Sequence, residues 1–374
     1  MKIARLKLSS EEKRLLWQLR TKGPLPRSDL AMALQVSNSA LTKLSRNVIS
    51  MGLVEEQASS DAGGRGRPTV PLTISAAGGF AVGATVHKGM LEIALVDYAG
   101  GVISLTSEEV GAPDPLVFAQ LLEQRITDLS VKHRLLGGRF LGVGIGLPGP
   151  PKGRDGGQWN IVNDLPGWRN IDLRQILDEA LGLPTMLEND ANASALAEYY
   201  LSDTIRKSST VVVFLLGYGI GAGVIEDGRL LKGEFGGAGE IGGLYPSGQP
   251  RPTTMDLLSV LREAGCTVQS IAHFDEATVG HEALIERWLD RAAGQLEAAV
   301  SSAISWFDPG EIVFSSPLPE SIMVRLAARL NQGQLRWPEH RQPIDIRVSR
   351  LGGSSIALGA ALLPIHASTT VSFW

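Results

Sequence analysis

The stretch NSALTKLSRNVISM, residues 38–51, decides the fold of the first part of this chain. Ser37 stands directly before it as a helix N-cap, and Gly52 follows it as a stop signal. Its apolar residues recur at the spacing of one helix face, and they are Leu41, Leu44, Val48 and Met51. The pattern predicts a helix whose first turn is polar and faces outward.

The neighbouring segments extend this pattern into a small domain. In chain order we expect helices over 11–22 and 29–34 (the second with Ser28 as its N-cap), a strand over 54–57, a turn-rich wing over 59–68 and a returning strand over 69–74. Helix, short helix, tight turn and helix form a helix-turn-helix. The sequence therefore predicts a winged helix-turn-helix.

The outward side chains of the third helix suit DNA. In this fold the helix enters the major groove, where asparagine pairs with adenine, lysine binds guanine or phosphate, and small hydroxyls permit close approach. The predicted contacts to a double-stranded DNA operator are Ser37, Asn38, Ser39, Thr42, Lys43 and Arg46 on the helix, and Arg65 and Arg67 in the wing. The alternative is a three-helix module that binds a protein through an ordinary polar face.

Charge and composition agree with a DNA-binding module on a globular body. Residues 1–70 hold 12 Lys and Arg against 6 Asp and Glu, whereas the remaining residues hold 23 against 33. A basic module favours a polyanion as partner. The chain of 374 residues is long enough for two or three domains. Its single cysteine, Cys266, and the absence of a signal peptide or long apolar run predict a cytoplasmic protein with no membrane partner.

Beyond residue 75 the sequence predicts strands, with glycines within or beside them, that alternate with helices. We expect two similar halves around a cleft, with strands over 79–97, 139–147, 210–216 and 311–314, a hairpin over 223–231, and helices over 173–181 and 282–306. The glycine cluster 217–223 runs into a hairpin, so it does not match a dinucleotide-binding fingerprint. The six histidines show no spacing that predicts a metal site.

The segment of this body whose side chains best suit ligand binding is LENDANASALA, residues 187–197. Asn189 and Asp190 lie where a strand over 185–187 passes into a helix, so their side chains can face the cleft beside helix-terminal amides. A carboxylate and an amide together suit the hydroxyls of a sugar. The alternative is a pair of N-cap residues that only starts the helix.

The chain resembles the ROK family of repressors, open reading frames and sugar kinases from about residue 12 to residue 366. Six features carry the resemblance, and they are the winged helix with GRGRP, GVGIGLPGP (142–150), DLPGW (164–168), LENDAN (187–192), LGYGIGAG (216–223) and GGAGEIGG (236–243). The resemblance implies an α/β fold, in which the winged helix-turn-helix precedes an actin-like, hexokinase-like (ribonuclease H-like) two-lobed domain. It implies a DNA-binding domain over 1–75, a first lobe over 76–190 completed by a C-terminal helix within 353–374, such as 354–363, and a second lobe over 191–352 that carries the effector cleft and the oligomer contacts.

The resemblance also assigns roles to residues. Asp190 matches the carboxylate that deprotonates the sugar hydroxyl in kinase members, and Asn189 and Glu240 match sugar-binding neighbours. Asp164 stands where an asparagine is usual in the family, and Asp256 stands where a further glutamate is usual. The predicted effector contacts therefore also include Asp164 and Asp256, although each differs from the residue that is usual at its position.

Two departures from the kinase pattern point away from catalysis. Where kinase members have a glycine-rich phosphate turn, this chain reads TVHKGM over 85–90. Phosphoryl transfer depends on positioning the γ-phosphate, which bulky Val86 and His87 do not allow. Gly243 replaces a zinc-binding histidine, and the cysteines of the zinc run are absent over 245–256. We expect no catalytic residue, no metal and no cofactor.

The sequence thus predicts a sequence-specific transcriptional regulator, as a homodimer or homotetramer. We expect a repressor of carbohydrate uptake or catabolism genes that responds to a sugar or sugar derivative bound between the two lobes. Two alternatives stay open at this point. One is a sugar kinase with an added DNA-binding module, and the other is a dimeric DNA-binding protein whose body binds no effector.

Overall fold

The computed structural model describes residues 6–57, 70–153, 156–161, 165, 167–246, 248–269 and 271–370. The chain forms two compact units. The first consists of 1–145, 174–187 and 360–374, and the second of 146–173 and 188–359. The winged helix therefore groups with the first lobe. The three-domain division expected from the sequence stays a prediction.

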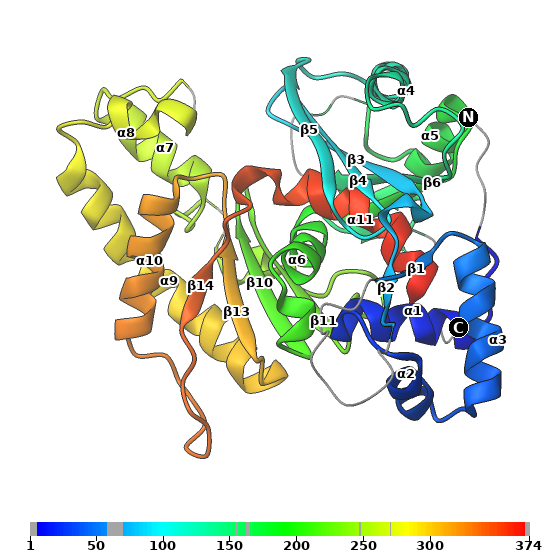
Figure 1. The fold of residues 1–374 in the computed structure, drawn as a ribbon. Helices are drawn as coiled ribbons and strands as arrows, with labels where there is room; N and C mark the ends of the chain where they lie inside the picture. Colours follow the sequence, from blue (N-terminus) through cyan, green and yellow to red (C-terminus); the bar gives the residue numbers. More distant parts are fainter. Residues whose placement is uncertain are drawn as a thin grey trace. The chain divides into compact units, whose positions relative to one another are not determined.

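The first unit begins with the predicted helix-turn-helix (Figure 1). Its elements are α1 (Ser10–Lys22), α2 (Arg27–Leu34), α3 (Asn38–Ser50), β1 (Val54–Glu56) and β2 (Leu72–Ile74). The two strands pair antiparallel, with Val54 opposite Ile74. Ser37 caps α3 as predicted, because its hydroxyl accepts a hydrogen bond from the backbone N–H of Ala40 at 3.2 Å. The predicted wing, with Arg65 and Arg67, lies outside the described residues.

The start of α2 differs from the prediction. Ser28 was expected to be the N-cap, but Pro26 occupies that position and Ser28 lies in the first turn of the helix. The Ser28 hydroxyl donates to the carboxylate of Asp29 instead of capping the backbone. The backbone of Pro26 already has the extended ψ of 153° that a cap residue needs, so the helix begins two residues earlier than the serine suggested.

A five-stranded sheet follows. Its strands are β3 (Phe80–His87), β4 (Met90–Asp97), β5 (Val102–Glu109), β6 (Phe140–Leu147) and β9 (Thr185–Asn189), in the order β5-β4-β3-β6-β9. The helices of this part are η1 (Ala76–Gly78), α4 (Pro115–Lys132) and α5 (Leu173–Leu181). The predicted strands over 79–97 and 139–147 and the helix over 173–181 are confirmed.

The second unit contains another five-stranded sheet, in the order β12-β11-β10-β13-β14. Its strands are β10 (Thr210–Leu216), β11 (Ile220–Glu226), β12 (Arg229–Leu230), β13 (Glu311–Ser315) and β14 (Ile346–Val348), with a small β7 (Pro151–Lys152) and β8 (Gln158–Trp159) pair apart from them. Its helices are α6 (Asp190–Leu201), η2 (Thr204–Arg206), η3 (Ile241–Leu244), α7 (Thr254–Glu263), η4 (Ile271–His273), α8 (Phe274–Ala277), α9 (Glu282–Phe307), α10 (Glu320–Gln332) and η5 (Gly352–Ser354). The core lies between the sheet and α9, where Phe214 packs edge-on against Phe314 and Trp288 is buried. The hairpin predicted over 223–231 is confirmed, since Glu226 pairs with Arg229 across the turn Asp227-Gly228.

The C-terminal helix α11 (Ser355–Thr369) is longer than the sequence suggested. It was expected to end before Pro364, but it continues through the proline. Proline has no N–H and leaves the carbonyl four residues earlier, that of Ala360, without its helical partner. Gly144 of β6 lies directly against this carbonyl, because an added Cβ at Gly144 would overlap it. The close approach of β6 explains why a glycine stands there.

Two arginines, the buried Arg20 and the half-buried Arg139, hold the winged helix on the first lobe. Arg20 of α1 donates to the carbonyl of Tyr98 at 2.6 Å, and its guanidinium lies 4.7 Å from the centre of the Tyr98 ring. Arg139 donates to the carbonyls of Gly78 at 2.7 Å and of Met51 at 2.8 Å. Charge-assisted hydrogen bonds of this kind are stronger than neutral ones. The first lobe and the winged helix are therefore joined as one body.

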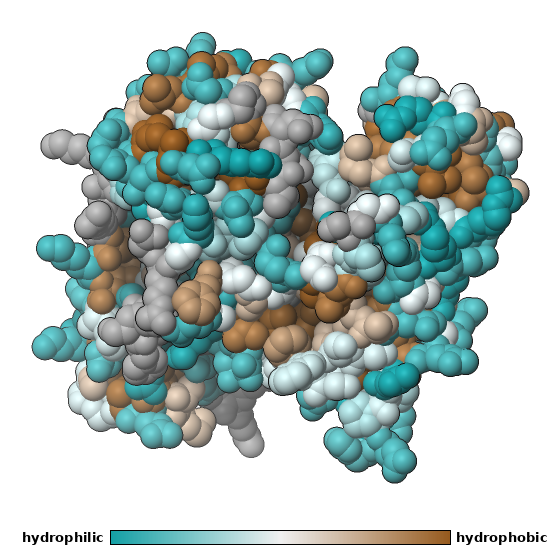
Figure 2. All heavy atoms as spheres, turned by 180° about the vertical axis from the view of Figure 1, so that it is seen from behind, coloured by the Kyte–Doolittle hydropathy of each residue, from teal (hydrophilic) through white to brown (hydrophobic). Residues whose placement is uncertain are grey.

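The described part of the chain holds no helix that is both long and apolar enough to cross a membrane. The surface in Figure 2 mixes hydrophilic and hydrophobic side chains, with the hydrophilic ones prevailing.

Candidate functional site

Asn189 lies at the junction that the sequence singled out, between β9 and α6. It is the N-cap of α6, since its side-chain oxygen accepts from the backbone N–H groups of Ala191 at 2.8 Å and Asn192 at 3.2 Å. Its amide nitrogen donates to the carbonyl of Gly149 at 3.2 Å and to Oε1 of Glu240 at 3.1 Å. Asn189 is thus a helix cap that also joins two distant segments, so capping is only part of its role.

Asp190 follows in the first turn of α6 and has an unusual protonation equilibrium. Burial is the main cause that raises the pKa of its carboxyl, and the nearby carboxylate of Glu240 adds to it; against a hydrogen bond from the N–H of Ala191, the pKa reaches about 7. Burial also raises the pKa of Glu240. The structure therefore brings Asn189, Asp190 and Glu240 together in the second unit. Desolvated carboxyl groups at one place favour a ligand that donates hydrogen bonds, as sugar hydroxyls do.

A further charged pair supports this cluster. Glu188, the residue before Asn189, is buried, and its Oε1 accepts from the N–H of Asn189 and from Nδ2 of Asn192, both at 3.0 Å. Lys232 places its Nζ 2.6 Å from Oε2 of Glu188. Sequence reasoning missed this pair. Lys232 stands in a glycine-rich stretch 44 residues away from Glu188, and no local pattern links the two.

The other predicted effector contacts have different outcomes. Asp164 lies outside the described residues. Asp256 lies in the first turn of α7, where its carboxylate accepts from the indole N–H of Trp288 at 2.7 Å and from Arg291. Both partners belong to α9, so this carboxylate fastens α7 to α9. A role of Asp256 in ligand binding stays a prediction.

Two glycines of the cluster over 217–223 have a packing explanation. An added Cβ at Gly223 would lie 2.6 Å from the carbonyl of Ala191 and 2.6 Å from the Cβ of Ala195. An added Cβ at Gly221 would lie 3.0 Å from the Cβ of Ala191. These glycines let β11 approach α6 closely, and α6 is the helix whose N-terminus carries the candidate site.

The turn between β3 and β4 is short and tightly packed. His87 pairs with Met90 at the end of the ladder, so Lys88 and Gly89 form a two-residue turn, with φ values of 48° and 79°. The N–H groups of Val110 and Gly111 both donate to the carbonyl of Gly89. Burial lowers the pKa of His87 to about 4, so its imidazole is neutral at pH 7.

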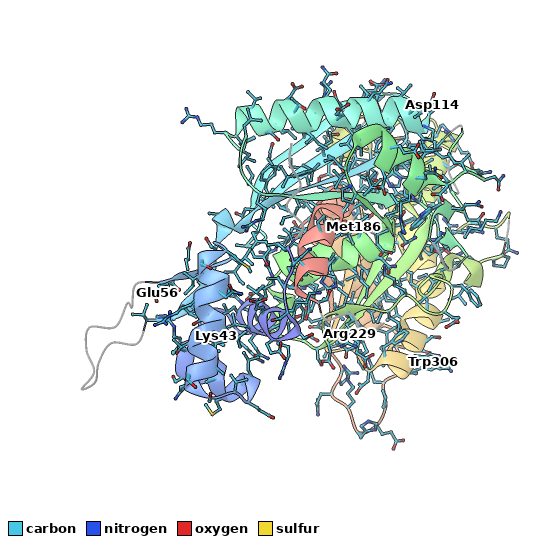
Figure 3. The ribbon with its side chains drawn as sticks, turned by 90° about the vertical axis from the view of Figure 1, so that its right-hand side faces the viewer. Lys43, Glu56, Asp114, Met186, Arg229 and Trp306 are labelled. Carbon is cyan, nitrogen blue, oxygen red and sulfur yellow. The ribbon has the colours of Figure 1, made fainter. Side chains whose placement is uncertain are left out.

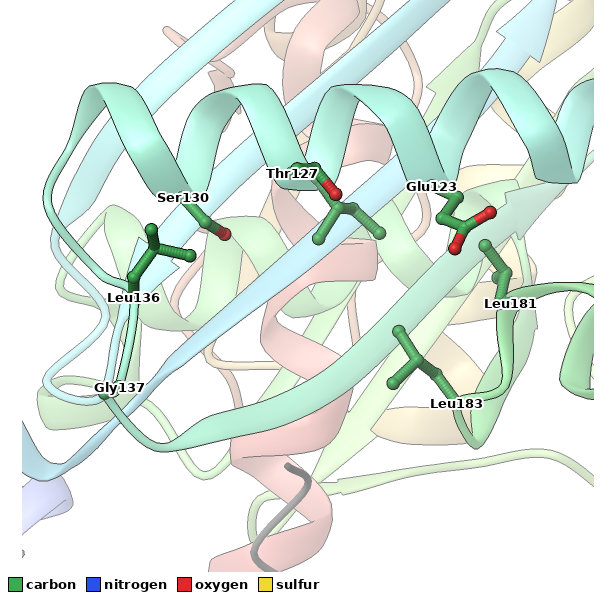
Figure 4. A pocket seen from close by; sticks show the side chains of 9 residues that line it. Glu123, Thr127, Ser130, Leu136, Gly137, Leu181 and Leu183 are labelled. Atoms are coloured by element: carbon green, nitrogen blue, oxygen red, sulfur yellow. The ribbon is translucent and has the colours of Figure 1, made fainter. Parts of the chain in front are cut away.

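A separate hollow of about 350 Å³ lies in the first unit (Figure 4). It is lined by α4, by the segment 136–138 and by the end of α5 with the residues that follow. Glu123 and Thr127 project into it from α4, opposite Leu181 and Leu183. None of the predicted site residues lines this hollow.

The candidate DNA-binding face is the exposed side of α3, on which Figure 3 labels Lys43. Its predicted members Ser37, Asn38, Ser39, Lys43 and Arg46 are exposed, and Thr42 is half-buried. The hydroxyl of Thr42 donates to the carbonyl of Asn38 at 2.7 Å, and the hydroxyls of Ser37 and Ser39 lie 2.9 Å apart. Lys43 and Arg46 border a groove of about 740 Å³ between α3 and α1, whose other wall carries Glu11 and Glu12.

Known proteins resemble both parts of the chain. Residues 85–255 match the ROK family and residues 8–62 match the MarR family. The DNA-binding transcriptional repressor Mlc of Escherichia coli strain K12 is 24% identical over 376 residues, which cover 94% of this chain and 91% of that protein. A crystal structure of a ROK family transcriptional regulator, a homologue of E. coli Mlc, superposes with a TM-score of 0.71 at 23% identity over 96% of both chains. The ROK hexokinase of Thermus thermophilus superposes with a TM-score of 0.58 at 26% identity over 76% of this chain and 97% of that one. These matches confirm the predicted fold class, a winged helix followed by a hexokinase-like α/β body.

Proposed function

Because this chain carries a ROK family domain behind an N-terminal MarR-type winged helix, we propose that it is a sugar-responsive transcriptional repressor. The observation that carries the proposal is the presence of two sites in one chain. One is the exposed polar and basic face of α3, and the other is the cluster of Asn189, Asp190 and Glu240. The first site binds a DNA operator of carbohydrate uptake or catabolism genes. The second binds a sugar or sugar derivative.

Regulation requires the sugar to bind two conformations of the protein with different affinity. Arg20 and Arg139 support such coupling, because they fasten the winged helix to the first lobe, so that a movement of this lobe carries the winged helix with it. A homodimer or homotetramer, acting in the cytoplasm, would present two winged helices to two half-sites of the operator. A change in their spacing then releases the DNA.

A sugar kinase is the second candidate, because a pKa of about 7 suits Asp190 as a general base. The β3–β4 turn argues against it. Phosphoryl transfer needs backbone N–H groups that approach the phosphates closely, whereas this turn has only two residues and follows the bulky side chains of Val86 and a neutral His87. An ATP-coupled assay with a panel of hexoses separates the two functions. Turnover that Asp190→Asn abolishes would establish the kinase.

The test of the repressor is an operator titration. Genomic fragments recovered with the purified protein supply the operator, and sugars are then added to the complex. The proposal expects one of them to weaken DNA binding in the wild type and not in Asp190→Ala. Calorimetry of the protein against the same sugars tests the remaining alternative, a DNA-binding dimer without an effector. Absence of heat for every sugar, with DNA binding intact, would favour that alternative.

A further inference from the structure

The segment from Lys232 to Glu240 brings Glu240 to the candidate site, and it is fixed at both ends. Near its start, the carbonyl of Lys232 accepts from the N–H of Ala238 at 3.1 Å, which closes the segment into a compact loop. Near its end, the carbonyl of Gly239 accepts from the N–H of Ala222 in β11 at 2.8 Å. An added Cβ at Gly239 would overlap the carbonyl of Ala222. The loop thus lies against β11 immediately before Glu240.

The loop is also attached to the start of α6, through the carboxylate of Glu188. This side chain is 5% exposed, whereas that of Lys232 is 56% exposed, and Nζ and Oε2 are 2.6 Å apart. A nearly buried carboxylate is costly unless a positive charge and hydrogen bonds compensate it. The hydrogen bonds come from Asn189 and Asn192 at the start of α6, and Lys232 supplies the charge. One side chain therefore links the loop of Glu240 to the helix that carries Asn189.

We propose that Lys232 is a positioning residue for the effector site, which acts through Glu188 and does not touch the ligand. Its ion pair holds the loop over 232–240 against the start of α6. The loop in turn keeps Glu240 within hydrogen-bond reach of Asn189 before the ligand arrives. This inference rests on the proposed function, because it assigns the pre-ordering of the same sugar site. A site that is ordered in advance spares the ligand the cost of ordering it.

The first test measures order without any ligand. Hydrogen exchange of the full-length protein is compared between wild type, Lys232→Met, Lys232→Arg and Glu188→Gln. Lys207→Met, which removes an exposed lysine beyond the far end of α6, is the control. Lys232→Met and Glu188→Gln should each speed exchange over residues 236–243 about tenfold or more, since the loop loses its attachment. Lys232→Arg and Lys207→Met should exchange as the wild type does. Unchanged exchange in Lys232→Met would overturn the proposal.

The second test measures binding, with D-glucose, D-xylose and N-acetylglucosamine as probes in calorimetry. Lys232→Met and Glu188→Gln should each raise the Kd of the bound sugar about tenfold, and the double variant should raise it no further. DNA affinity without sugar should stay within about twofold. Additive effects of the two substitutions would overturn the proposal, because a lysine that touched the sugar directly would act independently of Glu188. If no probe binds the wild type, these sugars are excluded as effectors, and the exchange measurement still decides the role of Lys232.

Discussion

The helices α3 and α6 both begin with an N-cap side chain, but the first cap is exposed to solvent and the second is buried. Each helix begins with a polar side chain that accepts a backbone N–H, Ser37 in α3 and Asn189 in α6. Ser37 is exposed, and cationic side chains follow it along the helix. Asn189 is 6% exposed, is bonded to Glu240, and lies beside the carboxyl of Asp190.

The difference shows that the surroundings of a helix N-terminus, more than its cap, determine what it binds. Exposed donors beside Lys43 and Arg46 suit a phosphate backbone and base edges. Desolvated carboxyl groups repel an anion and favour a neutral ligand with hydroxyl groups. Four variants test this contrast, in order of decreasing expected effect.

Asn189→Ala should have the largest effect. It removes the cap of α6, leaves the buried carbonyl of Gly149 without its partner and takes away the donor to Glu240, so we expect the free energy of unfolding to fall by about 2–3 kcal/mol. Sugar binding should be lost. Urea denaturation and calorimetry measure the two effects. Asn189→Asp is the matched variant, because it keeps the capping oxygen but replaces the donor to Glu240 with a carboxylate. Sugar binding that survives in Asn189→Asp would contradict the role of that donor.

The double variant Lys43→Ala/Arg46→Ala should come next. We expect it to weaken operator binding by about tenfold to a hundredfold and to reduce the salt dependence of binding, since each lost phosphate contact removes a released counterion. Fluorescence anisotropy at several salt concentrations gives both quantities. Sugar affinity should not change. Equal operator affinity in the variant and the wild type would show that another face of the winged helix binds the DNA.

Asp190→Asn should show a smaller, pH-dependent effect. The folded protein holds a proton on Asp190 up to a pKa of about 7, whereas the unfolded chain releases it near pH 4. The wild type therefore loses stability as the pH rises from 4 to 7, and the loss is complete above pH 7. Asparagine does not titrate, so the variant should gain about 1–2 kcal/mol on the wild type between pH 5 and pH 8. Urea denaturation at the two pH values measures the gain. A constant difference would mean that Asp190 is ionised throughout this range.

Ser37→Ala should have the smallest effect. It removes an exposed cap, and water can satisfy the released N–H of Ala40, so we expect a loss of about 1 kcal/mol or less in stability. Thermal denaturation of the full chain measures it. A loss as large as that of Asn189→Ala would remove the contrast between the two helix starts.

The sequence predicted Ser37 as a cap and offered capping as the alternative role of Asn189, and the reason is local. Ser37 and Asn189 each precede a helical pattern directly, and short-range signals of this kind are visible in one chain. The same signal failed at Ser28, because Pro26 already held the cap conformation two residues earlier.

What depends on distant residues was not predictable. The pairing of Glu188 with Lys232 joins segments 44 residues apart, and the hydrogen bond from Asn189 to Glu240 joins segments 51 residues apart. Glu240 entered the sequence prediction only through the family resemblance. The close packing of β6 against α11 at Ala360 likewise requires Gly144, a glycine more than 200 residues earlier.

The central claim is that one chain binds DNA through the exposed start of α3 and a sugar through the buried start of α6. The most direct measurement is operator anisotropy at about 150 mM salt, with sugar added to the wild type, to Lys43→Ala/Arg46→Ala and to Asp190→Ala. The account predicts that the wild type binds the operator and that a sugar releases it from the DNA. It predicts that Lys43→Ala/Arg46→Ala binds the operator poorly, and that Asp190→Ala binds the operator but is not released by the sugar. A wild type that ignores duplex DNA, or that consumes ATP when given a hexose, would contradict it.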